Sequence, residues 1–257
     1  MLHKNENFRN LVEQKLKNVA NKKMNTLTKF MKEHFKKIFV INLDRRPDRY
    51  NDFCGRIPFD YKICERFVAI DGNAMLKVRK KNPYVDACHL SHKKVLEIIV
   101  KNEENLDNDL FVIFEDDVFF SSNFESFIYK LFPSITNEIS KNQLLVLYIG
   151  GRFDENFMPR KIHSWTKIAD NLYIRNELFD RVTPIERDRT TNVLILTTSL
   201  AKEIMLKTSH IDTSFPIDFL YNGIKKYIST ANIYEILPHI TYSPKDYQTD
   251  IQKYKKV

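Results

Sequence analysis

The chain has 257 residues, 43% of them hydrophobic, so it can bury a substantial core in one large or two small domains. Its formal net charge is +8, but residues 1–37 hold ten Lys and Arg against three acidic residues, whereas residues 38–257 hold 31 against 30. A nearly neutral body lacks the basic stripe of a nucleic-acid-binding domain, and no apolar run approaches the ~20 residues of a membrane span.

The cysteine content bears on the compartment. Cys54, Cys64 and Cys88 occur without a signal peptide, which predicts free thiols in a reducing environment. We therefore expect a soluble, cytoplasmic protein. The high Lys, Asn and Ile content with only five glycines suggests an AT-rich, microbial or viral genome.

Residues 1–36 are expected to form a basic amphipathic helical arm. Apolar residues from Phe8 to Phe35 recur at spacings of three and four, with lysines on the remaining face. Such a helix packs on its own domain or on a partner chain, which includes a homo-oligomer. Contact of residues 8–35 with an anionic membrane surface is the alternative. The expected division is therefore an arm over 1–36 and one domain over 37–257.

From residue 37 strand-like and helix-like segments alternate, which predicts an α/β fold. A charged loop with Pro47 is expected after the first strand, Asp86 and Ser199 are expected to cap helices, and Pro216 should lie in a first turn. Paired glycines at 150–151 indicate a tight turn or a close approach. Long loops with one or two short strands are expected over 152–190. Strands are expected at 37–43, 66–72, 110–118, 144–151, 191–197 and 228–238, and helices at 86–101, 123–132, 199–208 and 215–227.

Three adjacent carboxylates, Glu115, Asp116 and Asp117, follow the apolar run of the third strand. Because they repel one another and are costly to desolvate, they predict a bound cation rather than a stabilising contact. Oxygen ligands suit Mn²⁺ or Mg²⁺. In an extended segment Glu115 and Asp117 would share a face and hold one ion, leaving Asp116 for a ribose hydroxyl or the donor sugar. An acidic strand end exposed to solvent is the simpler interpretation.

Three arginines follow the first strand in the same loop. Arg45, Arg46 and Arg49 can pair with phosphate or stack on a base. They can equally form ordinary surface pairs with Asp44 or Asp48.

The segment "CHLSH" at 88–92 is expected near a helix start, where free N–H groups favour anions. Ser91 and His92 would then project from an otherwise apolar face as donor-binding residues. A structural role for His92 is the alternative. A zinc site formed by Cys64, Cys88, His89 and His92 is disfavoured because no Cys-x-x-Cys pair is present.

Taken in order, several segments resemble sequence blocks of glycosyltransferase family 25, which includes bacterial lipopolysaccharide glycosyltransferases and collagen hydroxylysine galactosyltransferases. The resemblance spans roughly residues 37–252, although the block at 88–92 lacks the family's preceding glycine, here Ala87, and 152–190 has no clear match. The segments are "INLDRRPDR", "RFVAIDG", "CHLSH", "VIFEDDV", "TTNVLILTTSLAKEIM" and "FPIDFL".

The resemblance implies a GT-A-like fold with a single mixed sheet, and an inverting transfer of galactose or glucose from a UDP-sugar to a glycan or hydroxylysine-like hydroxyl. It places Mn²⁺ at the Glu-Asp-Asp segment and makes Asn42, Leu43 and Asp44 candidates for the nucleoside.

An inverting transfer needs a base, and Asp218 in "FPIDF" matches the family's Pro-x-Asp. Asp116 is a second catalytic candidate and His239 a third metal ligand. An Asp in a first helical turn and a histidine at a strand edge also occur without such roles.

Two other functions remain open at this stage. A catalytically silent member of the fold could bind a partner through its basic arm. An acidic-pocket phosphoryl-transfer domain is the third interpretation.

Overall fold

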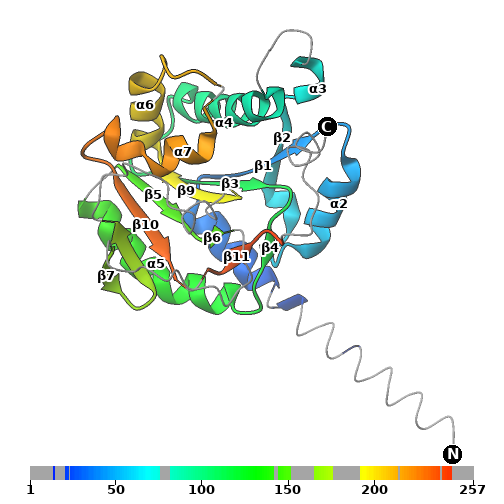
Figure 1. Ribbon diagram of the computed structural model, residues 1–257. Helices are drawn as coiled ribbons and strands as arrows, with labels where there is room; N and C mark the ends of the chain where they lie inside the picture. Colours follow the sequence, from blue (N-terminus) through cyan, green and yellow to red (C-terminus); the bar gives the residue numbers. More distant parts are fainter. Residues whose placement is uncertain are drawn as a thin grey trace, which may run out of the picture.

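The computed structural model describes residues 14, 21–22, 24–75, 82–141, 144–151, 165–175, 192–213, 215–237 and 239–244 (Figure 1). A large mixed sheet with helices on both faces confirms the predicted α/β fold. In spatial order its strands are β2 (Cys64–Ala69), β1 (Lys37–Leu43), β3 (Leu110–Glu115), β9 (Val193–Thr197), β5 (Leu145–Tyr148), β10 (Asn232–Ile236), β8 (Leu172–Arg175) and β7 (Trp165–Ala169).

Strand direction decides where a site can form. β2, β1 and β3 are parallel, and β5 is parallel to β10; β9 runs antiparallel to both β3 and β5, so these five strands share one direction. Their carboxyl ends meet at one edge of the sheet, which is where open α/β sheets bind ligands. β7 and β8 supply the two short strands expected within 152–190, as far as that segment is described.

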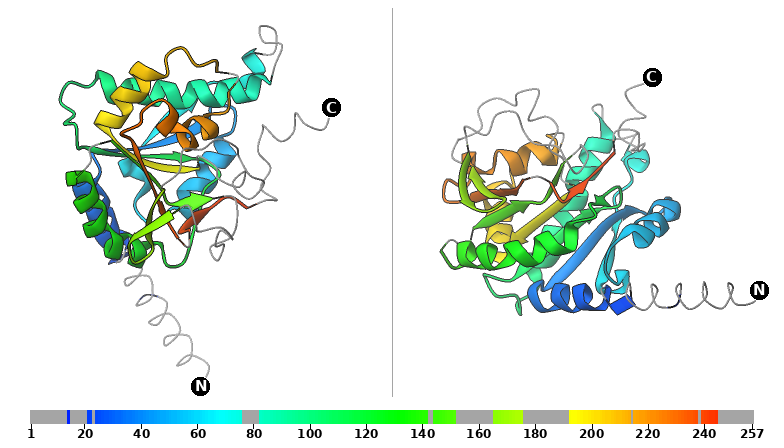
Figure 2. Two further views of the ribbon diagram at one scale, coloured as in Figure 1. Left: turned by 60° about the vertical axis from the view of Figure 1, so that its left-hand side comes forward. Right: turned by 90° about the horizontal axis from the view of Figure 1, so that it is seen from below.

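Side chains alternate across the sheet and build two cores. On β1, Ile38 and Val40 belong to one apolar cluster and Phe39 and Ile41 to the other. The helices α4 (Pro83–Lys101), α6 (Thr198–Lys207) and α7 (Ile217–Asn222) cover the second cluster, whereas α5 (Phe124–Lys141) and α2 (Pro47–Arg56) cover the first (Figures 1 and 2). The remaining short helix is α3 (Gly72–Met75).

The end of the predicted arm is part of the first core. Residues 24–34 are helical and lie beside α5, with Leu27, Met31 and Phe35 buried (Figure 2). The Phe30 ring contacts the Phe132 ring of α5 edge to face at 5.2 Å between centroids. Most of residues 1–23 lie outside the described residues, so the partner or membrane role of the arm stays a prediction. None of the helices within the described residues is long and apolar enough to cross a membrane.

Three local predictions were wrong. Pro47 does not sit in a loop: it opens α2, because its fixed φ and missing N–H suit a first helical position. α4 is capped by Asn82, whose side chain accepts from the Tyr84 N–H at 3.1 Å, and the predicted cap Asp86 is buried in the first turn. α6 is capped by Thr197 instead of Ser199.

Two helices also differ in length from the prediction. α5 continues through an internal proline to Lys141, and the expected helix over 215–227 is α7 followed, after Gly223, by a 3₁₀ turn at Ile224–Lys226. A second 3₁₀ turn, Tyr61–Ile63, precedes β2.

A small sheet that the sequence did not predict joins the same edge: β4 (Phe119–Phe120), β11 (Thr241–Tyr242) and β6 (Gly150–Gly151). β11 pairs with β6 in parallel, Thr241 opposite Gly150. A Cβ at Gly150 would lie 2.7 Å from the Thr241 carbonyl oxygen and closer still to its Oγ1. The close approach predicted from the paired glycines is therefore confirmed at Gly150.

Gly150→Ala is expected to lower the free energy of unfolding by about 1–3 kcal/mol, since a methyl group there overpacks a backbone contact. The matched control is Gly55→Ala in α2, where a Cβ meets nothing within 4 Å and gains about 0.5–1 kcal/mol from helix propensity. Urea unfolding of both variants checks the pair. Equal stability of the two would contradict the close packing of β6 on β11.

Candidate active site

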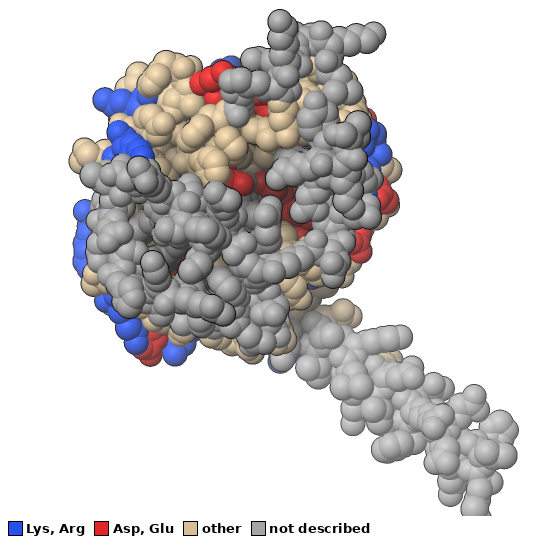
Figure 3. Space-filling model, in the orientation of Figure 1, with Lys and Arg blue, Asp and Glu red and all other residues tan. Residues whose placement is uncertain are grey.

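The acidic segment lies at the carboxyl edge of the sheet, as predicted. β3 ends at Glu115, whose N–H donates to the Asn192 carbonyl at 2.9 Å just before β9. The chain then turns, with the Val118 N–H donating to the Glu115 carbonyl at 3.3 Å. Asp116 and Asp117 therefore occupy the corners of a turn, and the expected extended geometry of Glu115 and Asp117 was wrong. On the face of the molecule that Figure 3 shows, acidic atoms are visible in a recess near the middle.

Asp116 is held by neighbours from β1 and α2. Its Oδ2 accepts from Asn42 Nδ2 at 2.6 Å, and its Oδ1 forms an ion pair with the buried Arg49 guanidinium. Burial raises the pKa of Asp116, while the charge of Arg49 and the hydrogen bond from Asn42 oppose that rise. Its carboxylate is thus engaged within the chain and positions the turn.

Asp117 is buried with weaker compensation. Ser243 Oγ donates to its Oδ1 at 3.3 Å, and the Arg49 guanidinium lies 3.6 Å from its Oδ2. Burial and then the charge of Glu115 raise the pKa of Asp117 to about 7, although Arg49 opposes the shift. The negative charges of Asp117 and Glu115 therefore repel each other, and a bound cation would relieve this repulsion.

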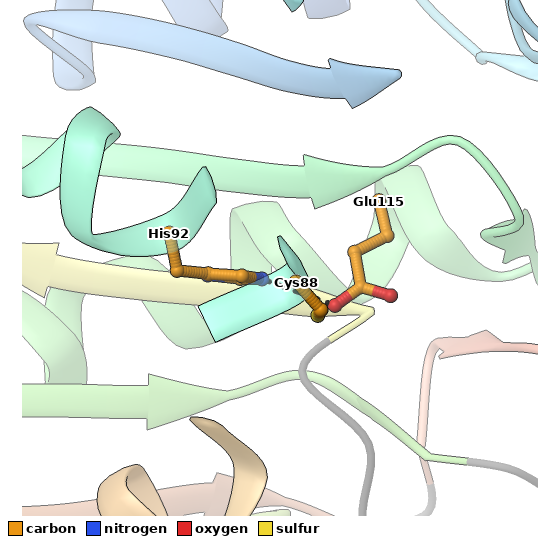
Figure 4. A group of neighbouring side chains, drawn as sticks. All are labelled: Cys88, His92 and Glu115. Atoms are coloured by element: carbon orange, nitrogen blue, oxygen red, sulfur yellow. Dashed lines mark hydrogen bonds and ion pairs between the residues drawn. The ribbon is translucent and has the colours of Figure 1, made fainter. Parts of the chain in front are cut away.

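Glu115 faces α4. Its Oε1 lies 3.1 Å from His92 Nε2, and its side chain is 24% exposed. Cys88, one helical turn before His92, points to the same place (Figure 4). One ligand atom from each of Cys88, His92 and Glu115 lies within 4.8 Å of the others.

The observed start of α4 changes the expected position of Ser91 and His92 within the helix. Because the helix begins at Pro83, both lie well inside it and the expected free N–H groups of a first turn are absent there, so this expectation was wrong. Ser91 Oγ accepts from the Ile70 N–H at 2.9 Å and donates to the Ala87 carbonyl at 2.7 Å. Ser91 thus ties α4 to the chain after β2, and His92 alone of the two contacts the acidic segment.

The three predicted phosphate-binding arginines all have carboxylate neighbours. Arg45 Nε donates to Asp71 at 2.7 Å. Arg46 pairs with Asp48 at 2.7 Å and, through that hydrogen bond, lowers the pKa of Asp48 to about 2. Arg49 lies on α2, not in the loop where it was expected. Arg45 and Arg46 remain candidates for phosphate because their pairs are largely exposed.

The nucleoside candidates surround a residue that the sequence reasoning missed. Arg66 of β2 donates to Asn42 Oδ1 from Nε at 2.9 Å and from Nη2 at 2.7 Å. Its Nη2 also lies 3.5 Å from the Leu43 carbonyl and 3.4 Å from Asp44 Oδ1. Arg66 belongs to the segment "RFVAIDG", which resembles the family and was expected to form a strand. Parallel pairing of that strand with β1 brings Arg66 to Asn42, and this pairing was the signal that could have identified the contact.

Arg56 and Ser243 were missed as well. Arg56 Nη2 donates to the Asp116 carbonyl at 3.0 Å and its Nε to the Val118 carbonyl at 3.2 Å, so the end of α2 clamps the acidic turn. Ser243, the residue directly after β11, contacts Asp117. Neither contact follows from local sequence pattern, because the partners are 60 and 126 residues apart.

Asp218 lies half-buried in the first turn of α7. Burial raises the pKa of the Cys88 thiol, and the charges of Glu115, Asp218 and Asp117 add to that rise. Burial, and then the charges of Cys88, Glu115 and Asp218, raise the pKa of the buried Tyr221. Asp218 and Glu115 therefore both act electrostatically on Cys88 and Tyr221, and the role of Asp218 as a base stays a prediction.

His239 is placed differently. Its Nε2 lies 2.8 Å from Glu235 Oε1 of β10, and both side chains are buried. This contact occupies Nε2, so a metal would have to be bound through Nδ1, and the role of third metal ligand stays a prediction.

Removing Arg49 is expected to destabilise the fold. Arg49→Met leaves two buried carboxylates without their cation, which costs about 3–5 kcal/mol in the free energy of unfolding. Arg46→Met, which breaks an exposed pair on the neighbouring loop, should cost less than about 1 kcal/mol. Urea unfolding of the two variants compares them directly, and similar losses would show that the Arg49 pair is not a buried ion pair of this kind.

Comparisons with known proteins agree with the motifs. A family model described as "Glycosyltransferase family 25 (LPS biosynthesis protein)" matches residues 35–221. No curated protein matches the chain.

Solved structures give distant likenesses. One, described as a glucose-1-phosphate thymidylyltransferase from Bacillus anthracis in complex with a sucrose, is 13% identical with a TM-score of 0.38, over 80% of this chain and 70% of that chain. Another, described as a mannose-1-phosphate geranyltransferase from Thermus thermophilus, is 10% identical with a TM-score of 0.40, over 79% of this chain and 73% of that chain. At these scores neither carries an inference about the site.

Proposed function

The chain belongs to glycosyltransferase family 25, and on that premise we propose that it transfers galactose or glucose from a UDP-sugar to a hydroxyl acceptor, with inversion at the anomeric carbon. The observation that carries the proposal is the pair Glu115 and Asp117: two carboxylates at the carboxyl edge of the sheet that repel each other, one buried and one partly exposed. Such a pair suits a cation that in turn binds a diphosphate.

The donor set fits a hard divalent cation. Mn²⁺ and Mg²⁺ prefer oxygen ligands and commonly bind through one or two carboxylates plus substrate phosphates. Glu115 and Asp117 would hold the ion. When bound, it would supply positive charge to neutralise the departing diphosphate.

The chain's own groups define the donor side. Asp44 is exposed at the end of β1 and offers its carboxylate to the nucleoside. Asn42 is buried, with its amide hydrogen-bonded to Arg46, Asp116 and Arg66, so it holds this end of β1 in place. The pairs of Arg45 with Asp71 and Arg46 with Asp48 are largely exposed and contribute little to stability, so a diphosphate can displace them at small cost. Asp116, bound to Arg49, acts here by fixing the turn that carries Asp117.

Asp218 is the proposed base. As the acceptor oxygen forms its bond to the anomeric carbon, the bond from that carbon to the diphosphate oxygen breaks, UDP leaves with the electron pair, and Asp218 takes the hydroxyl proton. The acceptor hydroxyl would then approach from the α7 side. A glycan or a hydroxylysine-like side chain is the proposed acceptor.

Release of UDP from UDP-hexoses tests the proposal. UDP-galactose and UDP-glucose are offered with Mn²⁺ and, in parallel, with EDTA in excess of the metal. We expect UDP release with Mn²⁺ and none with EDTA. Binding of the UDP-sugar without release would favour the silent, partner-binding alternative, for which the engagement of Asp116 by Arg49 is the supporting contact. Competition by a phosphate mimic but not by UDP would favour a phosphoryl-transfer domain.

A further inference from the structure

Cys88, His92 and Glu115 bring three different ligand atoms together. Cys88 and His92 lie one turn apart on α4, and Glu115 ends β3 (Figure 4). Their sulfur, nitrogen and oxygen atoms all lie within 4.8 Å of one another, close enough for one ion to contact all three after small side-chain shifts. The partly exposed Glu115 side chain gives an ion access to the group.

The chemistry of this group differs from that of the oxygen pair. A thiolate and an imidazole select zinc over Mn²⁺ or Mg²⁺, which prefer oxygen. Three protein ligands with one open position is an arrangement that zinc adopts.

Hydrogen bonding alone accounts incompletely for the arrangement. His92 is 0% exposed, and its Nε2 faces Glu115. Its Nδ1 is buried without a hydrogen-bond partner among the described residues, so Nε2 is the nitrogen that can face an ion shared with Glu115 and Cys88. The Cys88 thiol lies under the negative influence of Glu115, Asp218 and Asp117. A concentration of negative charge around a partly buried sulfur and a buried imidazole favours a cation.

We propose that Cys88, His92 and Glu115 form a zinc-binding site, and that Zn²⁺ bound there withdraws Glu115 from the oxygen pair and so inhibits the enzyme. On binding, the Cys88 sulfur forms a bond to zinc and its proton passes to solvent, with no change of oxidation state. The binding claim stands apart from the proposed function. Only the claim that zinc inhibits the enzyme rests on the proposed function.

Cobalt(II), a spectroscopic substitute for zinc, tests the binding. Added to the full chain, it should give the near-ultraviolet sulfur-to-cobalt charge-transfer band of a thiolate ligand, and Zn²⁺ should displace it. Cys88→Ser should lose the band and weaken Zn²⁺ binding by more than the ~10–100-fold that loss of an outer-shell partner costs. The matched control, Cys54→Ser, alters a thiol packed on the other core cluster and should keep the band.

X-ray absorption spectroscopy at the zinc edge uses the unaltered chain, so its result does not depend on whether a variant folds. One sulfur with nitrogen and oxygen ligands is expected. An all-oxygen shell, no cobalt band in the unaltered chain, or a band that survives in Cys88→Ser would overturn the zinc site.

For the inhibition, Zn²⁺ should suppress Mn²⁺-dependent UDP release in the Cys54→Ser variant and not in Cys88→Ser. Equal suppression in both would overturn that part, whereas absence of UDP release from any variant would count against the proposed function instead.

Discussion

Asp117→Asn is expected to lower Mn²⁺-dependent UDP release by at least about 10²–10³-fold, the scale on which enzymes lose rate when one preorganised electrostatic group is removed. An amide of nearly the same size keeps the contact with Ser243 but loses the charge that would hold the ion. The loss should appear in the rate and in the concentration of Mn²⁺ needed for half-maximal release. Initial rates measured across a Mn²⁺ titration report both.

The fold of this variant should not suffer. A carboxyl whose pKa is raised in the folded state destabilises the fold once it ionises, from the ordinary pKa of 3.8 up to and beyond about 7. Without metal, Asp117→Asn should therefore be as stable as the parent or more stable by about 0.5–2 kcal/mol at pH 8. Asp107→Asn, at an exposed surface pair with Lys202, is the matched control and should change neither quantity. Full activity of Asp117→Asn would remove Asp117 from the metal site.

Asp218→Asn is expected to slow sugar transfer to the acceptor by about 10²–10⁴-fold, the usual contribution of a general base. Because Asp218 lies on α7 while the proposed donor contacts come from β1, α2 and the acidic turn, affinity for the UDP-sugar with Mn²⁺ should stay nearly unchanged. Calorimetry of donor binding and rates of transfer to a saturating acceptor separate the two effects.

A nearby aspartate provides the comparison for this variant. Asp212→Asn alters an exposed residue six positions earlier and should leave the transfer rate within about twofold, as most surface substitutions do. If Asp218→Asn transferred sugar as fast as Asp212→Asn, another residue would have to accept the proton. If it lost donor binding as well, Asp218 would belong to the donor side.

The position of the site was predictable because it depends on strand periodicity and direction. Apolar runs at 37–43 and 110–115 are strands β1 and β3, and their parallel pairing brings Asn42 beside Asp116. The family resemblance was confirmed by the match over residues 35–221, which covers all six motifs quoted for it. The order of the motifs along the chain pointed to the family, whereas the amino-acid composition did not.

The pairing of individual charges was not predictable. Arg49 was assigned to a phosphate because it follows a strand in a charged stretch, but Pro47 starts a helix that turns Arg49 inward toward Asp116. His92 was expected to act through a helix terminus, and the earlier start of α4 at Pro83 instead points it at Glu115. α2 was not expected at all and α4 starts earlier than expected, and each difference changed the direction in which a side chain points. Long-range partners such as Ser243 leave no local pattern at all.

A crystal structure with Mn²⁺ and UDP, in which the anomalous signal of manganese locates the ion, tests the central claim most directly. The account predicts one manganese ion bound by carboxylate oxygens of Glu115 and Asp117 and by the diphosphate of UDP, with Arg49 still paired to Asp116. UDP bound elsewhere, or manganese absent from these two carboxylates at saturating metal, would contradict it.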